Sequence, residues 1–390
     1  MIAMRRLILP VLFAAFLAVL GYALGPTGRV ALEALAFLAD VWALDAGAAT
    51  GGGAPPVAVR YAGPEGAARI ADLYCDPGQR PGARLVLVHG LIESGKDDAR
   101  LRALGQALAR HRFLVVIPDI PGLRALRVGP DDIDEVRAAL EAARGFRDCG
   151  APADLPLGVV GFSYSAGPAL LALDAEPPPA GFAVLFGGYF DLRDVLLYLT
   201  TGRHRDRGVE RDGEALPEGR WVLLAANAER IADADDRAAL EAIGRRRRAD
   251  PGAPIDALAE GLGPAARAAL ELVENTDPAR FDTRFARLDP ALRDAIDALS
   301  PARALRRPLH ADLLLLHGRS DAIVPYTQSL KLVRGVATTG RTRLVLLGGF
   351  RHARPDREAE ESWWRVALRH PADSARMLTL LTDLLSRRRL

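Results

Sequence analysis

The sequence has 390 residues, enough for one large domain that carries an insertion. Hydrophobic residues make up 49% of it and charged residues 26%, which is the balance of a globular protein with a large core. The formal net charge is only +2, so no strong basic field points to nucleic acid as a partner.

The amino-terminal segment has the pattern of a membrane anchor or a signal peptide. Arg5 and Arg6 precede the uncharged apolar run of residues 7–24, which as a helix would span roughly 27 Å, close to the thickness of a bilayer's hydrocarbon core. Cleavage after Gly25 would make Pro26 the first residue after the cleaved bond, which is unfavourable for a signal peptidase site. We therefore expect an uncleaved anchor, with a cleaved signal peptide as the alternative. The two arginines should stay inside the cell, so that the rest of the chain lies outside the inner membrane.

Residues 30–44 are expected to form an amphipathic helix that rests either on the membrane surface or against the main domain. The run "GAATGGGAPP" at residues 47–56 has the composition of a flexible linker, so the folded domain is expected to begin near Val57. The two cysteines, Cys75 and Cys149, would form one bridge if the domain is exported. Neither lies in a CxxC or metal-ligand pattern, which favours two unpaired thiols.

From residue 57 onward, strand-like and helix-like segments alternate. An antiparallel pair opens the domain, and further strands and amphipathic helices follow in turn: strands at 57–63, 68–75, 84–90, 113–120, 157–162 and 182–188, and helices at 97–110, 131–144 and after Ser163. Near-continuous apolar strands separated by such helices are typical of a mostly parallel sheet with helices on both faces. The sequence therefore predicts an α/β fold.

The alternation stops for roughly 110 residues, which is longer than a simple connection. This stretch is rich in helical patterns, at 221–247, 255–274 and 289–300, and is predicted to be a helical cap inserted between two strands. Strands are expected again at 311–318 and 342–349, with helices at 328–336 and 372–387. The predicted organisation has five segments. They are an anchor or signal segment (1–29), a helix with a linker (30–56), a first catalytic part (57–190), a cap (191–304) and a second catalytic part (305–390).

The stretch "LGVVGFSYSAG" places Ser163 where a buried strand turns into a helix. Such a turn forces its central residue into a strained backbone conformation and needs small neighbours, here Gly161 and Ser165. The turn would lift the Ser163 hydroxyl above the sheet, at the positive end of the following helix. A serine that merely caps the helix would produce a similar pattern, but the residues at the other strand ends favour a nucleophile.

A serine nucleophile needs a base, an acid and donors for the oxyanion. His352 follows the last predicted strand and is the expected base; His89 and His317 lie in "HG" pairs expected to shape loops, and the other four histidines are read as surface residues. Asp321, after the strand at 311–318, is the expected acid, with Asp191 as its competitor. The backbone N–H groups of Leu91 and Tyr164 are the expected oxyanion donors.

Together these motifs resemble the α/β-hydrolase family. The resemblance rests on "LVLVHGL" at 85–91, "DIPG" at 119–122, "GFSYS" at 161–165, "HGRSDAIVP" at 317–325 and "GGFRH" at 348–352. The order of nucleophile, acid and histidine matches the family, and the similarity covers roughly residues 57–190 and 305–390. It implies hydrolysis without a metal or organic cofactor. Ser165 departs from the glycine usual in the family, so the backbone strain that the family's turn implies does not follow from the resemblance alone.

The expected function is a membrane-anchored serine hydrolase that cleaves a carboxylic ester or a related acyl bond. Its expected partners are a small-molecule or lipid-like acyl substrate, with the cap as the roof of the site, and the membrane. The same triad would also serve a peptidase, an amidase or an acyltransferase, and the sequence does not separate these. From another class, a non-catalytic binding or scaffold protein would use the fold alone.

Overall fold

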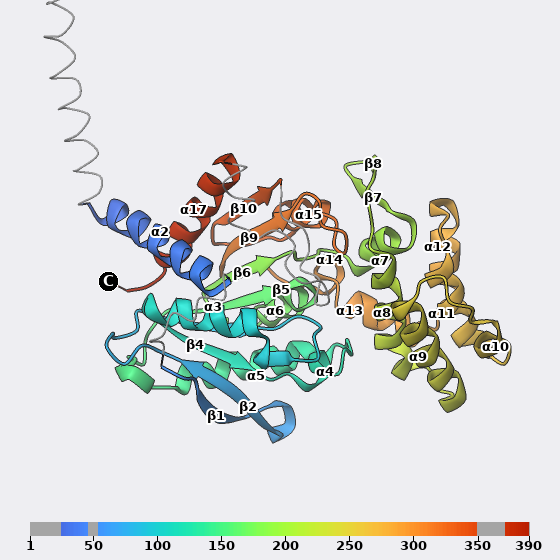
Figure 1. Ribbon diagram of the computed structural model, residues 1–390, viewed down its shortest axis with the longest axis horizontal. Coiled ribbons are helices and arrows are strands. Elements are labelled where there is room, and N and C mark those ends of the chain that lie inside the picture. Colours follow the sequence, from blue (N-terminus) through green and yellow to red (C-terminus); the bar gives the residue numbers. More distant parts are fainter. Residues whose placement is uncertain (1–24, 46–53, 349–370, 390) are drawn as a thin grey trace, which may run out of the picture.

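The computed structural model describes residues 25–45, 54–348 and 371–389 (Figure 1). An eight-stranded sheet in the order β1-β2-β4-β3-β5-β6-β9-β10 forms its centre. The strands are β1 Val57–Ala62, β2 Ala68–Tyr74, β3 Ala83–Val88, β4 Phe113–Pro118, β5 Leu157–Phe162, β6 Phe182–Phe186, β9 Asp312–Gly318 and β10 Thr342–Leu347. β2 runs antiparallel to β1 and β4, and the other neighbouring pairs are parallel. The predicted mostly parallel sheet is confirmed.

Helices cover both faces of this sheet because its central strands carry apolar side chains on each face. Along β3, Leu85 and Leu87 join the core beneath one layer of helices, whereas Val86 and Val88 join the core on the other face. The first layer consists of α2 Pro26–Asp45, α3 Ala99–Arg110 and α17 Pro371–Leu385. The second includes α5 Asp131–Gly145, α6 Ala166–Ala172 and α15 Thr327–Gly335. The short α4 spans Pro121–Arg124, and 3-10 turns lie at Pro64–Gly66, Gly95–Asp97, Asp148–Gly150, Ser163–Ser165 and Ala228–Arg230.

The amino-terminal helix α2 packs against the main body, which is one of its two expected positions. Its buried face includes Ala34 and Phe37, which lie in one core cluster with residues of α3 and α17. Glu33 accepts hydrogen bonds from both terminal nitrogens of Arg388, at 2.5 and 2.7 Å. The apolar run at 7–24 lies outside the described residues. Among the residues that are described, no helix combines the length and apolarity needed to cross a bilayer.

Helices fill most of the segment between β6 and β9, where the predicted alternation stops. Its elements are α7 Leu192–Thr201, β7 Arg203–Asp206, β8 Val209–Asp212, α8 Pro217–Asn227, α9 Ala234–Ala249, α10 Asp256–Ala259, α11 Pro264–Glu274, α12 Pro278–Ala286, α13 Pro290–Ala298 and α14 Pro301–Ala304. Figure 1 shows α8 to α12 grouped to one side of the sheet, away from the helices that cover its faces. This helical insertion has a hydrophobic core of its own, built around Trp221, Leu240 and Phe281.

Several parts of the helical insertion differ from the sequence prediction. The pattern at 255–274 is divided into α10 and α11, and α7 and α12 lie outside the predicted helical patterns. The helical pattern at 221–247 is broken into α8 and α9, because Asp233 caps the second helix by accepting hydrogen bonds from the N–H groups of Asp235 and Asp236. The β7–β8 hairpin was not predicted. It turns at Arg207 and Gly208, whose φ angles are 51° and 75°.

Cys75 and Cys149 form a disulfide, with their Cα atoms 6.3 Å apart. It joins the residue after β2 to the 3-10 turn that follows α5, across 74 positions of sequence. The sequence pattern favoured two unpaired thiols, and this prediction was wrong. Spacing alone could not reveal the pairing, because the two cysteines meet only after β2 and α5 have packed around the same sheet edge.

Candidate active site

The strand–helix turn predicted at Ser163 is present. β5 ends at Phe162, the 3-10 turn Ser163–Ser165 follows, and α6 continues directly from it. Ser163 is partly exposed and has φ = 54°, in the left-handed region that a residue with a side chain rarely adopts. Gly161 permits the sharp reversal, because a Cβ there would lie 2.7 Å from the Cα of Ala166. The backbone therefore stores strain at the predicted nucleophile.

Ser165 explains how this turn does without the family's usual glycine. Its φ and ψ of −66° and −12° are ordinary helical values, so this position does not need a glycine backbone. Its fully buried hydroxyl donates to the carbonyl of Val88 at 2.9 Å and accepts from the N–H of Phe162 at 2.9 Å. The side chain thus ties the end of β3 to the turn after β5.

The loop after β3 lies against the Ser163 turn. A Cβ added to Gly90 would lie 3.3 Å from the carbonyl oxygen of Phe162 and 4.0 Å from the Cβ of Ser163. Leu91, the expected oxyanion donor, is the next residue. The structure therefore places the loop that carries Leu91, one predicted donor, beside Ser163. The other predicted donor, Tyr164, is the next residue after Ser163.

His89 shapes this loop, as predicted. Its Nε2 accepts a hydrogen bond from the N–H of Ile120 at 3.2 Å, which leaves the proton on Nδ1 to be donated to the carbonyl of Gly90 at 2.8 Å. The ring is 1% exposed, and burial lowers its pKa. His89 is therefore a neutral structural histidine.

Asp321 lies at the same sheet edge as Ser163, in the loop after β9. One carboxylate oxygen, Oδ1, accepts hydrogen bonds from the N–H groups of Ile323 and Val324, each at 2.9 Å. Oδ2 lies 3.5 Å from Nε2 of His317, which also contacts the carbonyl of Val324 at 2.8 Å. Asp321 is 3% exposed. The loop therefore holds this carboxylate in one orientation.

The competing acid, Asp191, has a structural role. It caps α7, where its Oδ1 accepts from the N–H of Arg193 at 2.9 Å, and its Oδ2 lies 3.5 Å from a terminal nitrogen of Arg303. Burial raises the pKa of Asp191. These contacts explain an aspartate at position 191 without a catalytic role. We therefore favour Asp321 as the acid.

The predicted base, His352, lies outside the described residues. β10, the strand that precedes it, ends at Leu347, and β5, β9 and β10 run in the same direction through the sheet. The carboxyl ends of parallel strands meet at one edge, which is where open α/β sheets bind ligands. The topology therefore places the ends of β5, β9 and β10 at the same edge of the sheet.

The remaining described histidines do not form a second site. His111 and His204 were read as surface residues, and this was wrong because they are 7% and 6% exposed. His111 lies at the end of α3 and contacts α2, with its Nε2 3.3 Å from a carboxylate oxygen of Asp40, and His204 contacts the hydroxyl of Thr327 at 3.1 Å. Across the described ranges, no group of three or more His, Cys, Asp or Glu residues is placed to hold a metal ion.

Sequence reasoning missed a buried carboxylate beside the turn. The hydroxyl of Tyr164 donates to Oδ2 of Asp132 at 2.7 Å, and the N–H of Gly129 donates to the same oxygen at 2.9 Å. Asp132 is 4% exposed, and burial raises its pKa to about 6 even though these hydrogen bonds lower it. The tyrosine ring is thereby held against the start of α5.

An apolar cavity of about 70 Å³ separates Tyr164 from the core of the helical insertion. Its walls come from α7, α8, α9, α11 and α13, and they include Leu196, Leu224, Leu240 and Leu272. Asn227 is the polar exception on α8, and its side-chain amide donates to the carbonyl of Leu223. The cavity places apolar surface next to the residue that follows Ser163.

No protein-family model matches the sequence, and no curated protein matches it either. Among solved structures, the chain is similar to an acylaminoacyl peptidase in complex with a chloromethyl ketone, with 13% identity and a TM-score of 0.48 over 85% of this chain and 41% of that one. It is also similar to the Pyrococcus horikoshii acylaminoacyl peptidase, with 13% identity and a TM-score of 0.45 over 86% and 42%. The chain thus spans about two fifths of the length of these peptidases. A meta-cleavage product hydrolase from Pseudomonas fluorescens gives 16% identity and a TM-score of 0.42 over 84% and 98%.

The chain has the α/β-hydrolase fold that its motifs suggested. The class rests on the chain's own features: a mostly parallel sheet, a serine with positive φ on the turn after β5, and a loop after β3 that touches this turn.

Proposed function

We propose that the protein is a serine hydrolase that cleaves a carboxylic ester or a related acyl bond. The observation that carries this proposal is the left-handed backbone of Ser163 at the turn from β5 into α6, because a turn of this kind presents a nucleophile above the edge of the sheet. The neighbouring loop with Gly90 and the buried, hydrogen-bonded Asp321 support the same reading.

In the proposed reaction, the hydroxyl oxygen of Ser163 attacks the acyl carbonyl carbon while His352 takes the hydroxyl proton. Asp321 orients the imidazole and stabilises its charged form. The N–H groups of Leu91 and Tyr164 hold the developing oxyanion. His352 then gives its proton to the leaving alcohol, and a water molecule, activated by the same histidine, hydrolyses the acyl-enzyme and frees Ser163.

The apolar cavity beside Tyr164 supports a small apolar acyl group as substrate. Its volume is only about 70 Å³ and its walls are apolar, which favours a short apolar acyl chain over a long one. A panel of aryl acetate, butanoate and octanoate esters tests this assignment through kcat/KM. We expect the acetate and butanoate to be hydrolysed fastest. A preference for octanoate would contradict the assignment.

Labelling with a fluorophosphonate probe tests the nucleophile. The wild-type chain and a Ser386→Ala control, which removes an exposed hydroxyl on the loop after α17, should be labelled equally. Ser163→Ala should not be labelled, with circular dichroism unchanged. Labelling that persists in Ser163→Ala would move the nucleophile elsewhere, and a folded wild type with neither labelling nor turnover would favour a binding or scaffold protein.

The same triad would also act on amides or pass the acyl group to an acceptor other than water. Aminoacyl amides and thioesters therefore belong in the substrate panel beside the esters. Faster turnover of an amide than of its matched ester would make the protein a peptidase or amidase. An acyl product that forms only when a second alcohol or amine is added would make it an acyltransferase.

We further propose that the body of the protein lies outside the inner membrane, held by the apolar run at residues 7–24. The Cys75–Cys149 disulfide supports an oxidising compartment. Protease added to intact spheroplasts should digest the body, whereas a cytoplasmic marker protein should survive. Protection of the body from the protease would refute this orientation.

A further inference from the structure

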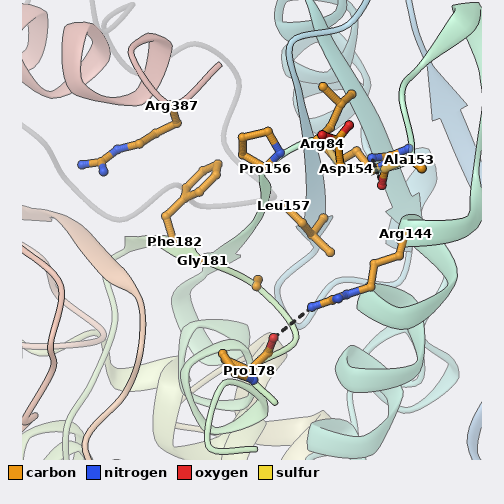
Figure 2. A pocket seen from close by; sticks show the side chains of 12 residues that line it. Arg84, Arg144, Ala153, Asp154, Pro156, Leu157, Pro178, Gly181, Phe182 and Arg387 are labelled. Carbon is orange, nitrogen blue, oxygen red and sulfur yellow. Dashed lines mark hydrogen bonds between the residues drawn. The ribbon is translucent and has the colours of Figure 1, made fainter. Parts of the chain in front are cut away.

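A second and larger cavity, of about 530 Å³, lies at the opposite edge of the sheet from Ser163 (Figure 2). Its walls come from the residues at which β3, β5 and β6 begin, together with the ends of α5 and the chain after α17. Leu157 lies at this edge and Phe162 at the other, so the length of β5, roughly 17 Å, separates the cavity from the Ser163 turn. The cavity is therefore a separate site.

Three arginines line this cavity, and a single lining residue, Asp154, is acidic. Figure 2 shows Arg144 and Arg387 on opposite sides of Leu157 and Phe182. Asp154 pairs with Arg389, and Arg387 pairs with Asp312, so these charges balance one another. The charges of Arg84 and Arg144 remain.

Within the described part of the chain, neither of these two arginines forms an ion pair with a carboxylate, although the charge of Asp154 acts on Arg84 from a greater distance. Arg84 is 1% exposed and donates to the carbonyl oxygens of Phe146 and Pro152, at 2.9 and 2.7 Å. Its buried Nε has no hydrogen-bond partner. Arg144, which is exposed, donates to the carbonyl oxygens of Pro178 and Pro179, at 2.9 and 2.8 Å. A buried cation without a counter-ion is costly, and an anion in the cavity would offset that cost.

The rest of the wall is apolar and includes Leu155, Pro156, Leu157 and Phe182. The volume is that of a small-molecule site. We propose that this cavity binds a small organic anion, a carboxylate or phosphate monoester with a compact apolar body. The acidic group would contact Arg144, and the apolar body would lie against Phe182 and Leu157.

Isothermal titration of the full chain with phenyl phosphate, benzoate, inorganic phosphate and neutral benzyl alcohol tests this proposal. We expect saturable binding of phenyl phosphate or benzoate, at least tenfold tighter than that of inorganic phosphate or benzyl alcohol. Arg144→Gln should weaken binding at least tenfold, because a charge-assisted contact is lost. Arg137→Gln is the matched control: it removes another outward-facing arginine of α5, paired with Asp134 away from the cavity, and should leave the affinity within twofold.

Three results would overturn the proposal. The first is no saturable binding of either aromatic anion to the wild type. The second is equal affinity in the wild type and Arg144→Gln, when both have the same circular dichroism and thermal midpoint. The third is Arg144-dependent binding to vesicles that contain phosphatidylglycerol without binding of the soluble anions, which would make the site a membrane contact. None of these measurements depends on the proposed hydrolase activity.

Discussion

Replacing Ser165 by alanine should destabilise the protein through the loss of one hydroxyl. In the wild type, this fully buried hydroxyl connects the carbonyl of Val88 with the N–H of Phe162, at 2.9 Å each. Ser165→Ala keeps the Cβ and leaves both backbone groups without this partner in a region from which water is excluded. A buried hydrogen bond contributes about 1 kcal/mol net, and an orphaned buried group costs about 1–3 kcal/mol. We therefore expect the free energy of unfolding to fall by about 2 kcal/mol.

Urea unfolding followed by circular dichroism measures this change. Thr379→Ala is the control, because it also removes a hydroxyl that bonds to a backbone carbonyl, but on the exposed face of α17. Its effect should stay within about 0.5 kcal/mol. Ser165→Gly should be at least as unstable as Ser165→Ala, although it restores the residue usual in the fold family. If Ser165→Ala unfolds within 0.5 kcal/mol of the wild type, the hydroxyl does not hold the turn, and our reasoning is wrong.

The same variant has a catalytic readout. If the Ser163 turn is the active site, loosening its connection to β3 separates the loops that carry Leu91 and Tyr164. We expect a lower kcat with little change in KM, because a displaced oxyanion donor affects the transition state more than the bound substrate. A rise in KM as large as the fall in kcat would indicate instead that the substrate cavity has collapsed.

Three further predictions follow from the site and its surroundings. Asp321→Asn should lower kcat by about 10³-fold or more with the fold intact, whereas Asp191→Asn should retain turnover; the reverse pattern would exchange the two roles. The pKa of Asp132 is raised in the folded state to about 6 from an ordinary value of 3.8, so its contribution to stability is lost as the pH rises through that interval. In urea unfolding, the free energy of unfolding of the wild type should fall by about 2 kcal/mol between pH 4 and pH 7, relative to that of Asp132→Asn. Parallel pH profiles for the two proteins would contradict this. Replacing Cys75 and Cys149 by serine should cost about 4 kcal/mol, because the disulfide closes a loop across 74 positions; alkylation of both thiols in the unreduced, unfolded wild type would disprove the bond.

The sequence predicted the sheet well because its central strands are buried on both faces. Runs such as "RLVLV" leave few alternatives to a central parallel strand, and Gly161 before Ser163 identifies a sharp turn. The β7–β8 hairpin escaped prediction because its inward side chains are polar. His204 and Asp206 are buried there, between aromatic rings and against Arg334, so the hydrophobic pattern with period two is missing.

The parts of the candidate site that the sequence could not show depend on contacts between distant segments. Asp132 looks like an ordinary acidic residue in the first turn of a helix, and only the packing of α5 against the Ser163 turn buries it beneath Tyr164. The arginines around the second cavity are equally ordinary in a sequence where most basic residues are arginine. Their arrangement appears only when the starts of β3, β5 and β6 lie side by side.

The docking of α2 changes what the glycine-rich stretch at residues 47–56 can do. Asp45 ends a helix whose Glu33 is bound to Arg388, and Val57 begins the sheet, so the elements on both sides of this stretch belong to the same packed body. In the sequence, the packed helix α2 therefore lies between the proposed anchor at residues 7–24 and the glycine-rich stretch, so this stretch does not separate that anchor from the body. The anchor that we propose at residues 7–24 would instead meet the body at Pro26, where α2 begins and packs with α3 and α17.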